Sequence, residues 1–128
     1  MNNENDYKLG IAWQDIQHRR IIEIISEINS NPHEDYMSLF AELTFYAKDH
    51  FDTEEQYMRE LVYDRTESHI EEHKAFVKKI VEISKRCIVD DDLHSDLPSF
   101  LNDWLLNHIL VVDKELAVFL LKFEHNNA

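Results

Sequence analysis

The sequence predicts an all-α protein that folds as an up-down-up-down bundle of four helices. The chain of 128 residues contains one glycine, Gly10, and two prolines, so it has little of the turn chemistry that strand hairpins need. Apolar residues recur at spacings of three and four over four long stretches, which is the period of an α-helix with one buried face. The links between these stretches are short, and short links favour antiparallel neighbours in a bundle.

The first helix is expected over residues 12–29. Its inward face carries His18 together with isoleucines at helical spacing, namely Ile21, Ile22, Ile25 and Ile28. The polar segment 29–31 follows this stripe, so the helix should end there.

The second helix is expected over residues 32–62. Asn31 can cap its first turn, and Pro32 suits the first helical position because that position needs no backbone donor. The apolar stripe of this helix contains two polar side chains, His50 and Glu54. A histidine and a glutamate on a buried face require a partner, because burial without one is costly.

The last two helices are expected over residues 65–87 and 97–122. The third helix carries His69 and His73 on its apolar face, and the fourth carries His108 on its own. All four expected helices therefore direct at least one imidazole towards the same core.

The charge balance narrows the classes of partner. The chain has 26 Asp and Glu against 13 Lys and Arg, a formal net charge of −13, which disfavours nucleic acid and anionic membrane surfaces as partners. No apolar run approaches the ~20 residues of a membrane span. Cys87 is the only cysteine, so no intrachain disulfide can form. We expect one domain over residues 1–128, located in the cytoplasm.

Two pairs of polar residues have the spacing of metal ligands on a helix. His50 and Glu54 are four residues apart, as are His69 and His73, so each pair lies one turn apart on one helix face. Such pairs are common on solvent faces without a function, but these lie on apolar stripes. A buried site that binds metal would satisfy them all. Imidazole suits iron, zinc and copper, and carboxylates can bridge two cations.

The order and spacing of these residues resemble the hemerythrin family over about residues 13–123. The family pattern is a histidine on the first helix, His-x-x-x-Glu on the second, His-x-x-x-His on the third and His-x-x-x-x-Asp on the fourth. This sequence matches it with seven residues, namely His18, His50, Glu54, His69, His73, His108 and Asp113. The resemblance implies a metal site in the bundle core that holds two iron ions with a bridging oxo or hydroxo group.

The resemblance also implies a role for each ligand. Three histidines would hold a six-coordinate iron, namely His69, His73 and His108. His18 and His50 would hold the second iron, and Glu54 and Asp113 would bridge both ions. Coordination counting then leaves the second iron with an open position, which distinguishes a site that binds ligands from a closed structural site.

The spacing in the fourth helix does not fit a regular α-helix. Asp113 is five positions after His108, which places the two about 140° apart around an α-helix. We therefore predict a π-helical turn between them, a feature that tends to occur at functional sites.

The resemblance further implies an apolar oxygen pocket beside the open iron. Five residues would line it, namely Ile21, Phe51, Trp104, Leu105 and Ile109. Ordinary core packing is the alternative interpretation of each of them. A dry pocket would keep water and protons away from the ligand.

Two further positions concern hydrogen bonds around the site. Asp15, three residues before His18, could accept a hydrogen bond from a ligand imidazole, or it could be an acid at the helix N-terminus. In the family a tyrosine commonly follows the bridging aspartate by three residues, whereas this chain has Leu116. The departure concerns a contact behind the ligands and not the ligands themselves.

The function that the resemblance implies is reversible binding of dioxygen, or of another small diatomic molecule. The protein would serve as an oxygen carrier or store, or as an oxygen or redox sensor with a signalling partner. A di-iron enzyme such as a peroxidase, oxidase or nitric oxide reductase is the alternative. None of the eight histidines has a glutamate three residues earlier, as carboxylate-rich di-iron bundles do, so we favour binding and expect no catalytic residue.

Overall fold

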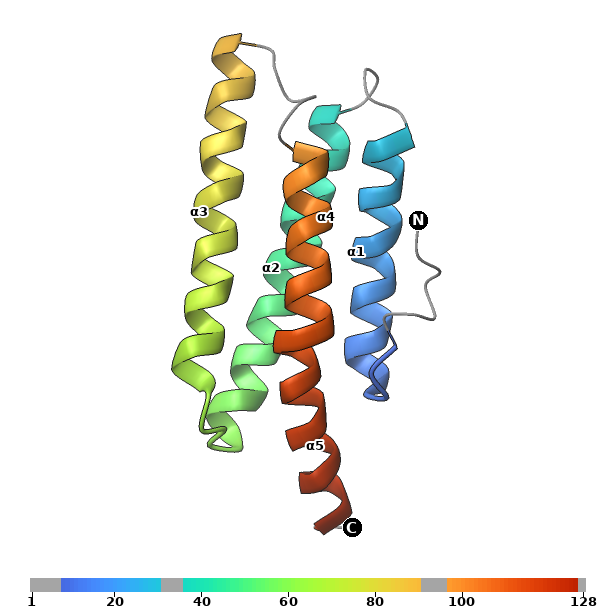
Figure 1. Ribbon diagram of the computed structural model, residues 1–128, viewed down its shortest axis with the longest axis vertical. Helices are drawn as coiled ribbons and strands as arrows, with labels where there is room; N and C mark the ends of the chain where they lie inside the picture. Colours follow the sequence, from blue (N-terminus) through green and yellow to red (C-terminus); the bar gives the residue numbers. More distant parts are fainter. Residues whose placement is uncertain (1–7, 31–35, 91–96, 127–128) are drawn as a thin grey trace.

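The computed structural model describes residues 8–30, 36–90 and 97–126 (Figure 1). Within these ranges the chain is helical with no strand. The elements in chain order are α1 (Ala12–Ser30), α2 (Tyr36–Glu60), α3 (Thr66–Asp90), α4 (Leu97–Asn107), the π-helical turn η2 (His108–Asp113) and α5 (Lys114–Asn126). Because α4, η2 and α5 follow one another without a break, they form the fourth rod of the bundle.

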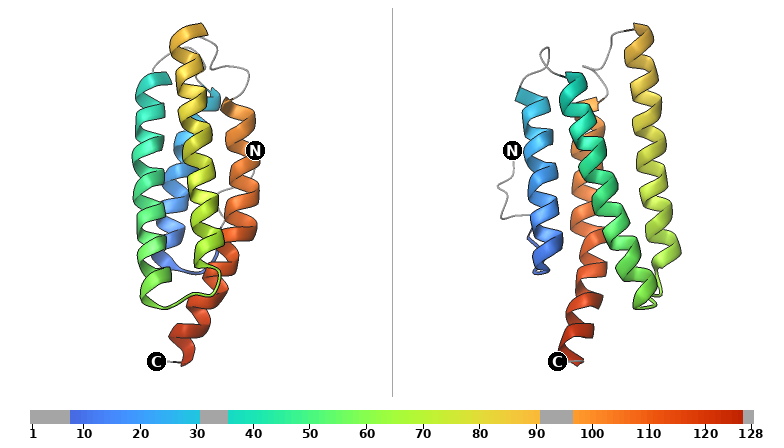
Figure 2. Two further views of the ribbon diagram at one scale, coloured as in Figure 1. Left: turned by 90° about the vertical axis from the view of Figure 1, so that its left-hand side faces the viewer. Right: turned by 180° about the vertical axis from the view of Figure 1, so that it is seen from behind.

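Consecutive rods run in opposite directions, which confirms the predicted all-α bundle (Figures 1 and 2). The figures also show that α5 extends beyond the ends of the other helices. Within the described parts of the chain, no helix combines the length and apolar character needed to cross a lipid bilayer.

The observed bounds differ from the predicted ones mainly at helix C-termini. The second helix ends at Glu60, two residues early, and Val62 then adopts a left-handed φ of 54° that a continuing helix does not allow. The third helix continues to Asp90 and the fourth to Asn126. The predicted cap at residues 31 and 32 lies outside the described residues, and so does the side chain of Cys87.

The apolar core consists of two clusters with a polar layer between them. Ile11, just before α1, belongs to the smaller cluster and Ile21, on α1, belongs to the larger. His18 lies between them in the sequence. On α2, Phe51 belongs to the larger cluster and Met58 to the smaller. Each fully buried side chain of this size stabilises the fold by roughly 1.5–3 kcal/mol. This burial supplies the free energy that holds polar side chains away from water in the layer between the clusters.

Candidate metal centre

Every rod contributes to the polar layer. α1 supplies one residue, α2 and α3 two each, and the two ends of η2 supply the last two. All seven side chains are buried, with at most 2% of each residue exposed, and they are His18, His50, Glu54, His69, His73, His108 and Asp113. The structure thus brings together every residue that the sequence predicts as a metal ligand.

The carboxylate of Asp113 lies at the centre of this layer, with two imidazoles at each oxygen. Its Oδ2 is 2.7 Å from Nε2 of His18 and 3.1 Å from Nε2 of His50. Its Oδ1 is 3.0 Å from Nε2 of His69 and 2.9 Å from Nε2 of His108. One oxygen therefore faces α1 and α2, while the other faces α3 and η2.

Glu54 also faces histidines from several helices. Its Oε1 lies 3.1 Å from Nε2 of His73 and 3.3 Å from both Nε2 of His69 and Nε2 of His50. Nε2 of His108 is more distant, at 3.9 Å. Both carboxylates therefore lie between the histidines of α3 and those of the other helices.

The ligand atoms form two overlapping groups, and within each group all of them lie within 4.8 Å of one another. One group contains three histidines and both carboxylates, namely Glu54, His69, His73, His108 and Asp113. The other contains His18 and His50 with the same two carboxylates. Each group has the size and donor types of one cation site, and the shared carboxylates can serve both.

Several atoms in this layer are buried without a hydrogen-bond partner among the described residues. Three of them face one another at short distances, namely Nε2 of His69, Nε2 of His108 and Oδ1 of Asp113. In addition, Nε2 of His18 and Nε2 of His50 lie only 3.2 Å apart. Nitrogen lone pairs that converge in this way, beside carboxylates, are satisfied by cations, because unsatisfied buried polar atoms are costly. The residues present therefore fit a pair of metal ions.

Both buried carboxylates in the layer remain ionised. Burial raises the pKa of Asp113, but the surrounding histidines lower it further, to well below its usual value. Glu54 behaves in the same way: burial and Asp113 raise its pKa, and His50, His108 and His69 shift it below the usual range. Two ionised carboxylates in a low-dielectric layer attract cations strongly.

The same interactions act on the histidines in the opposite sense. Burial lowers the pKa of His69, but the nearby carboxylates of Asp113 and Glu54 overcome that effect and raise it to about 9. For His108, the nearby carboxylates overcome burial and raise the pKa to about 10. A metal ion that takes these imidazoles as ligands must therefore displace protons.

The predicted π-helical turn is confirmed. η2 covers His108–Asp113, and both of these residues are buried, as is Ile109, whereas Val111 is 49% exposed. The wider turn adds one residue on the solvent side and keeps His108 and Asp113 on the same inward face.

Two histidines are oriented by side chains outside the ligand set. His50 donates from Nδ1 to Oε1 of Gln17 at 2.6 Å, and His73 donates from Nδ1 to Oε2 of Glu55 at 2.9 Å. These bonds fix the proton on Nδ1 and leave Nε2 free to face the centre. The sequence analysis did not identify either residue.

The structure does not contain the hydrogen bond that Asp15 could accept from a ligand imidazole. Both of its carboxylate oxygens accept backbone N–H groups instead, from Leu9 at 2.8 Å and from Gly10 at 3.0 Å. Because these bonds tie down the segment before α1, the alternative interpretation of Asp15 as a helix N-terminal acid fits the structure.

Gln14 is the main residue that the sequence analysis missed. It is fully buried, and its Nε2 donates to Oε2 of Glu54 at 3.0 Å and to the backbone carbonyl of Asp113 at 3.3 Å. Leu116, which cannot donate a hydrogen bond, is also fully buried. Gln14 lies one helical turn before His18, and that spacing is the signal that places it on the same face.

The five predicted pocket residues lie beside the polar layer, within the larger apolar cluster. Ile21, Phe51, Leu105 and Ile109 are buried, and Trp104 is partly buried and packs against them. Their contact with the site is aromatic in two places. The ring of Phe51 stacks on His73 with centroids 3.9 Å apart, and the Trp104 ring stacks on His108 at 4.7 Å.

Comparison with known families identifies the class of protein that this fold and site define. Residues 9–120 match the family described as "Hemerythrin HHE cation binding domain". The chain belongs to the hemerythrin family. Comparison with solved structures gave no match.

Several curated relatives are similar over most of the chain, and each carries the name bacteriohemerythrin. The one from Stenotrophomonas maltophilia is 31% identical over 89% of this chain and 77% of its own length. The one from Clostridium acetobutylicum is 30% identical over 88% of this chain and 95% of its own length. The one from Methylococcus capsulatus is 28% identical, over 85% and 87% respectively.

Proposed function

We propose that this protein binds dioxygen reversibly at a non-haem di-iron centre. The observation that carries the proposal is the pair of overlapping ligand groups, which share two carboxylates and differ in their histidines. A three-histidine group and a two-histidine group give the two metal positions unequal numbers of protein ligands. The position with fewer protein ligands has room for an exogenous ligand.

We assign His69, His73 and His108 to one iron and His18 and His50 to the other. Glu54 and Asp113 would be shared by both irons, and an oxo or hydroxo group would bridge them. Two ferrous ions, when bound, supply the electrons that dioxygen takes up and returns on release. The protein holds the ligand side chains in fixed positions and excludes water from the surrounding core.

The surrounding side chains support binding rather than catalysis. The five residues proposed to line the oxygen pocket, Ile21, Phe51, Trp104, Leu105 and Ile109, include no group that titrates near neutral pH. With no acid or base in the pocket itself, protons reach the ligand slowly, which favours release of dioxygen unchanged over its reduction.

The proposed role in the cell is that of a carrier, a store or a sensor. A sensor would pass its oxygen or redox state to a partner protein. We place the protein in the cytoplasm, because a single cysteine suits a reducing compartment.

The test is to purify the full chain without air, measure iron per chain, and record the visible spectrum before oxygen, with oxygen and after oxygen removal. We expect two irons and a ligand-to-metal band that appears with oxygen and disappears when oxygen is removed. Asp113→Asn should lose iron, whereas the matched variant Asp103→Asn, at an exposed position on α4, should retain it.

Two other outcomes would contradict the proposal. Irreversible oxidation with turnover of peroxide or nitric oxide would support the enzyme alternative. A chain that binds no iron would overturn the assignment of the centre itself.

A further inference from the structure

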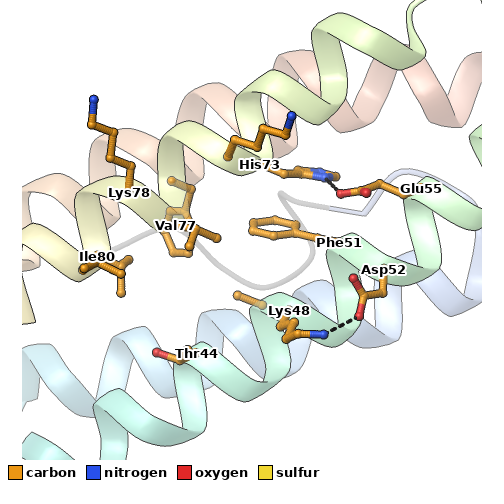
Figure 3. A pocket seen from close by; sticks show the side chains of 13 residues that line it. Thr44, Lys48, Phe51, Asp52, Glu55, His73, Val77, Lys78 and Ile80 are labelled. Atoms are coloured by element: carbon orange, nitrogen blue, oxygen red, sulfur yellow. Dashed lines mark hydrogen bonds and ion pairs between the residues drawn. The ribbon is translucent and has the colours of Figure 1, made fainter.

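A surface groove with a volume of about 490 Å³ lies between α2 and α3 (Figure 3). Its lining is largely apolar, from residues on both helices, namely Ala47, Phe51, Phe76, Val77, Ile80 and Val81. Charged side chains also line it, and two of the lysines are paired with acids: Lys48 with Asp52 at 2.9 Å and Lys74 with Glu71 at 3.5 Å. The groove therefore offers apolar surface that a small apolar solute can contact.

The groove reaches the metal centre at Phe51 and His73, both of which line it. Figure 3 shows the Phe51 ring facing His73 across the space between the two helices. Phe51 also contacts the rings of His50, His108 and Trp104, with centroids 6.0, 5.8 and 5.9 Å away. The same aromatic ring therefore borders both the groove and the ligand histidines.

We propose that this groove is the access route, and a transient binding site, for small apolar gases that enter the core, dioxygen among them. The inference rests on the proposed function for its physiological ligand. Apolar gases concentrate against apolar surface because contact with water is unfavourable for them. From the groove, displacement of the Phe51 ring leads to residues of the proposed oxygen pocket.

An access route has a kinetic signature that distinguishes it from a change at the iron. Narrowing the route slows association and dissociation by the same factor, because both pass the same barrier. The equilibrium affinity then stays constant. A distortion of the metal centre instead changes the affinity.

The variant Val77→Phe tests this directly, because Val77 lines the groove and is 50% exposed, so that a larger ring can fill the groove without overpacking the core. Val118→Phe is the matched control on α5, where Val118 is 44% exposed and does not line the groove. We expect Val77→Phe to slow both rate constants for dioxygen severalfold, at unchanged affinity, and Val118→Phe to leave both unchanged. Equal rates in all three proteins, or a changed affinity alone in Val77→Phe, would overturn the proposal.

Xenon provides a second measurement that does not depend on oxygen chemistry. In xenon-pressurised crystals of the full chain, we expect an anomalous peak between Val77 and Phe51 that is absent from Val77→Phe. No xenon in the groove would overturn its assignment as a gas site. If the unaltered protein binds xenon there but no dioxygen, the proposed function fails while the groove remains a site for apolar gases.

Discussion

His108 and Asp113 face each other across a single π-helical turn, with Nε2 of the histidine 2.9 Å from Oδ1 of the aspartate. In a regular α-helix the same two positions would diverge by about 140°. The π-helical turn therefore allows one helix to present two ligands to the same centre. Whether the helix can do so depends on how many positions separate the two residues.

Changing that count tests the role of the turn. Deleting Val111, which is 49% exposed, places the aspartate four positions after His108 instead of five, or about 40° away on a regular α-helix. We expect this variant to retain two metal ions per chain. Inserting an alanine after Val111 should remove them, because six residues correspond to about 240°. The measurement is iron per chain, with circular dichroism to verify helix content. A folded deletion variant that loses its iron would contradict this explanation.

The sequence was sufficient to predict the bundle and to place the seven candidate ligands on buried helix faces, because both depend on local periodicity. Ligands such as His50 and Glu54 lie on apolar stripes, and helix geometry alone places them on one face. The π-turn was predictable for the same reason, since five residues do not fit an α-helical turn. Helix ends were less predictable: the left-handed Val62, which ends α2 early, has no glycine to signal it.

Hydrogen bonds between helices were not predictable from spacing. Gln14 and Glu54 are separated by 40 positions, and only the packing of α1 against α2 brings them together. For Asp15 the spacing suggested a contact that the structure lacks. Asp15 is only three positions from His18, but its carboxylate accepts from nearer backbone N–H groups. Which donor a carboxylate accepts from depends on which N–H groups lie nearest to it in the folded structure.

Replacing Gln14 with leucine removes the amide that donates to Glu54. Loss of a partner that orients a metal ligand typically weakens metal affinity about 10- to 100-fold, so the variant should bind metal more weakly by about that factor. The loss of the donor also leaves Glu54 a stronger ligand for ferric iron, so the reduction potential of the centre should fall. Chelator competition and spectroelectrochemistry measure these two effects.

Gln56→Leu is the matched control for this change. Gln56 is also a glutamine whose Nε2 donates to a glutamate, Glu60, at 3.1 Å, but it is exposed. We expect metal affinity and potential to stay unchanged in this control. If Gln14→Leu leaves the potential where it was, Gln14 has a packing role alone.

Replacing Glu55 with leucine removes the acceptor for Nδ1 of His73. Loss of such a partner for a metal-bound histidine typically weakens metal affinity by about 10- to 100-fold, because the ring is no longer oriented and becomes less basic. Glu55→Gln retains an acceptor without the charge, so its metal affinity should lie between those of the unaltered protein and Glu55→Leu. Competition with a chelator measures the affinities, and Glu60→Leu on the exposed face of α2 should match the unaltered protein. Equal affinity in Glu55→Leu would mean that packing alone orients His73.

The raised pKa values of His69 and His108 predict that metal binding releases protons. Without metal, their pKa values of about 9 and about 10 keep both rings protonated at pH 7, whereas a metal ion requires neutral imidazole. Raising the pH removes these protons in advance, so apparent metal affinity should increase up to about pH 10. Calorimetry in buffers of different ionisation enthalpy measures the protons released. In the metal-free Asp113→Asn variant both pKa values should be lower, because the charge of Asp113 that raises them is lost.

The same groups predict how the stability of the metal-free protein depends on pH. A histidine whose pKa is raised on folding contributes stability that is complete below its unfolded value of 6.5 and is lost as the pH rises through its folded value. That loss should occur at about pH 9–10. Glu54 and Asp113, with lowered pKa values, contribute stability above about pH 4.5 that is lost in acid. Melting temperatures of the metal-free chain should therefore fall on both sides of neutral pH. Because the metal-loaded chain holds neutral imidazoles, its melting temperature should not show the alkaline fall; the same fall in both forms would show that these histidines are not metal ligands.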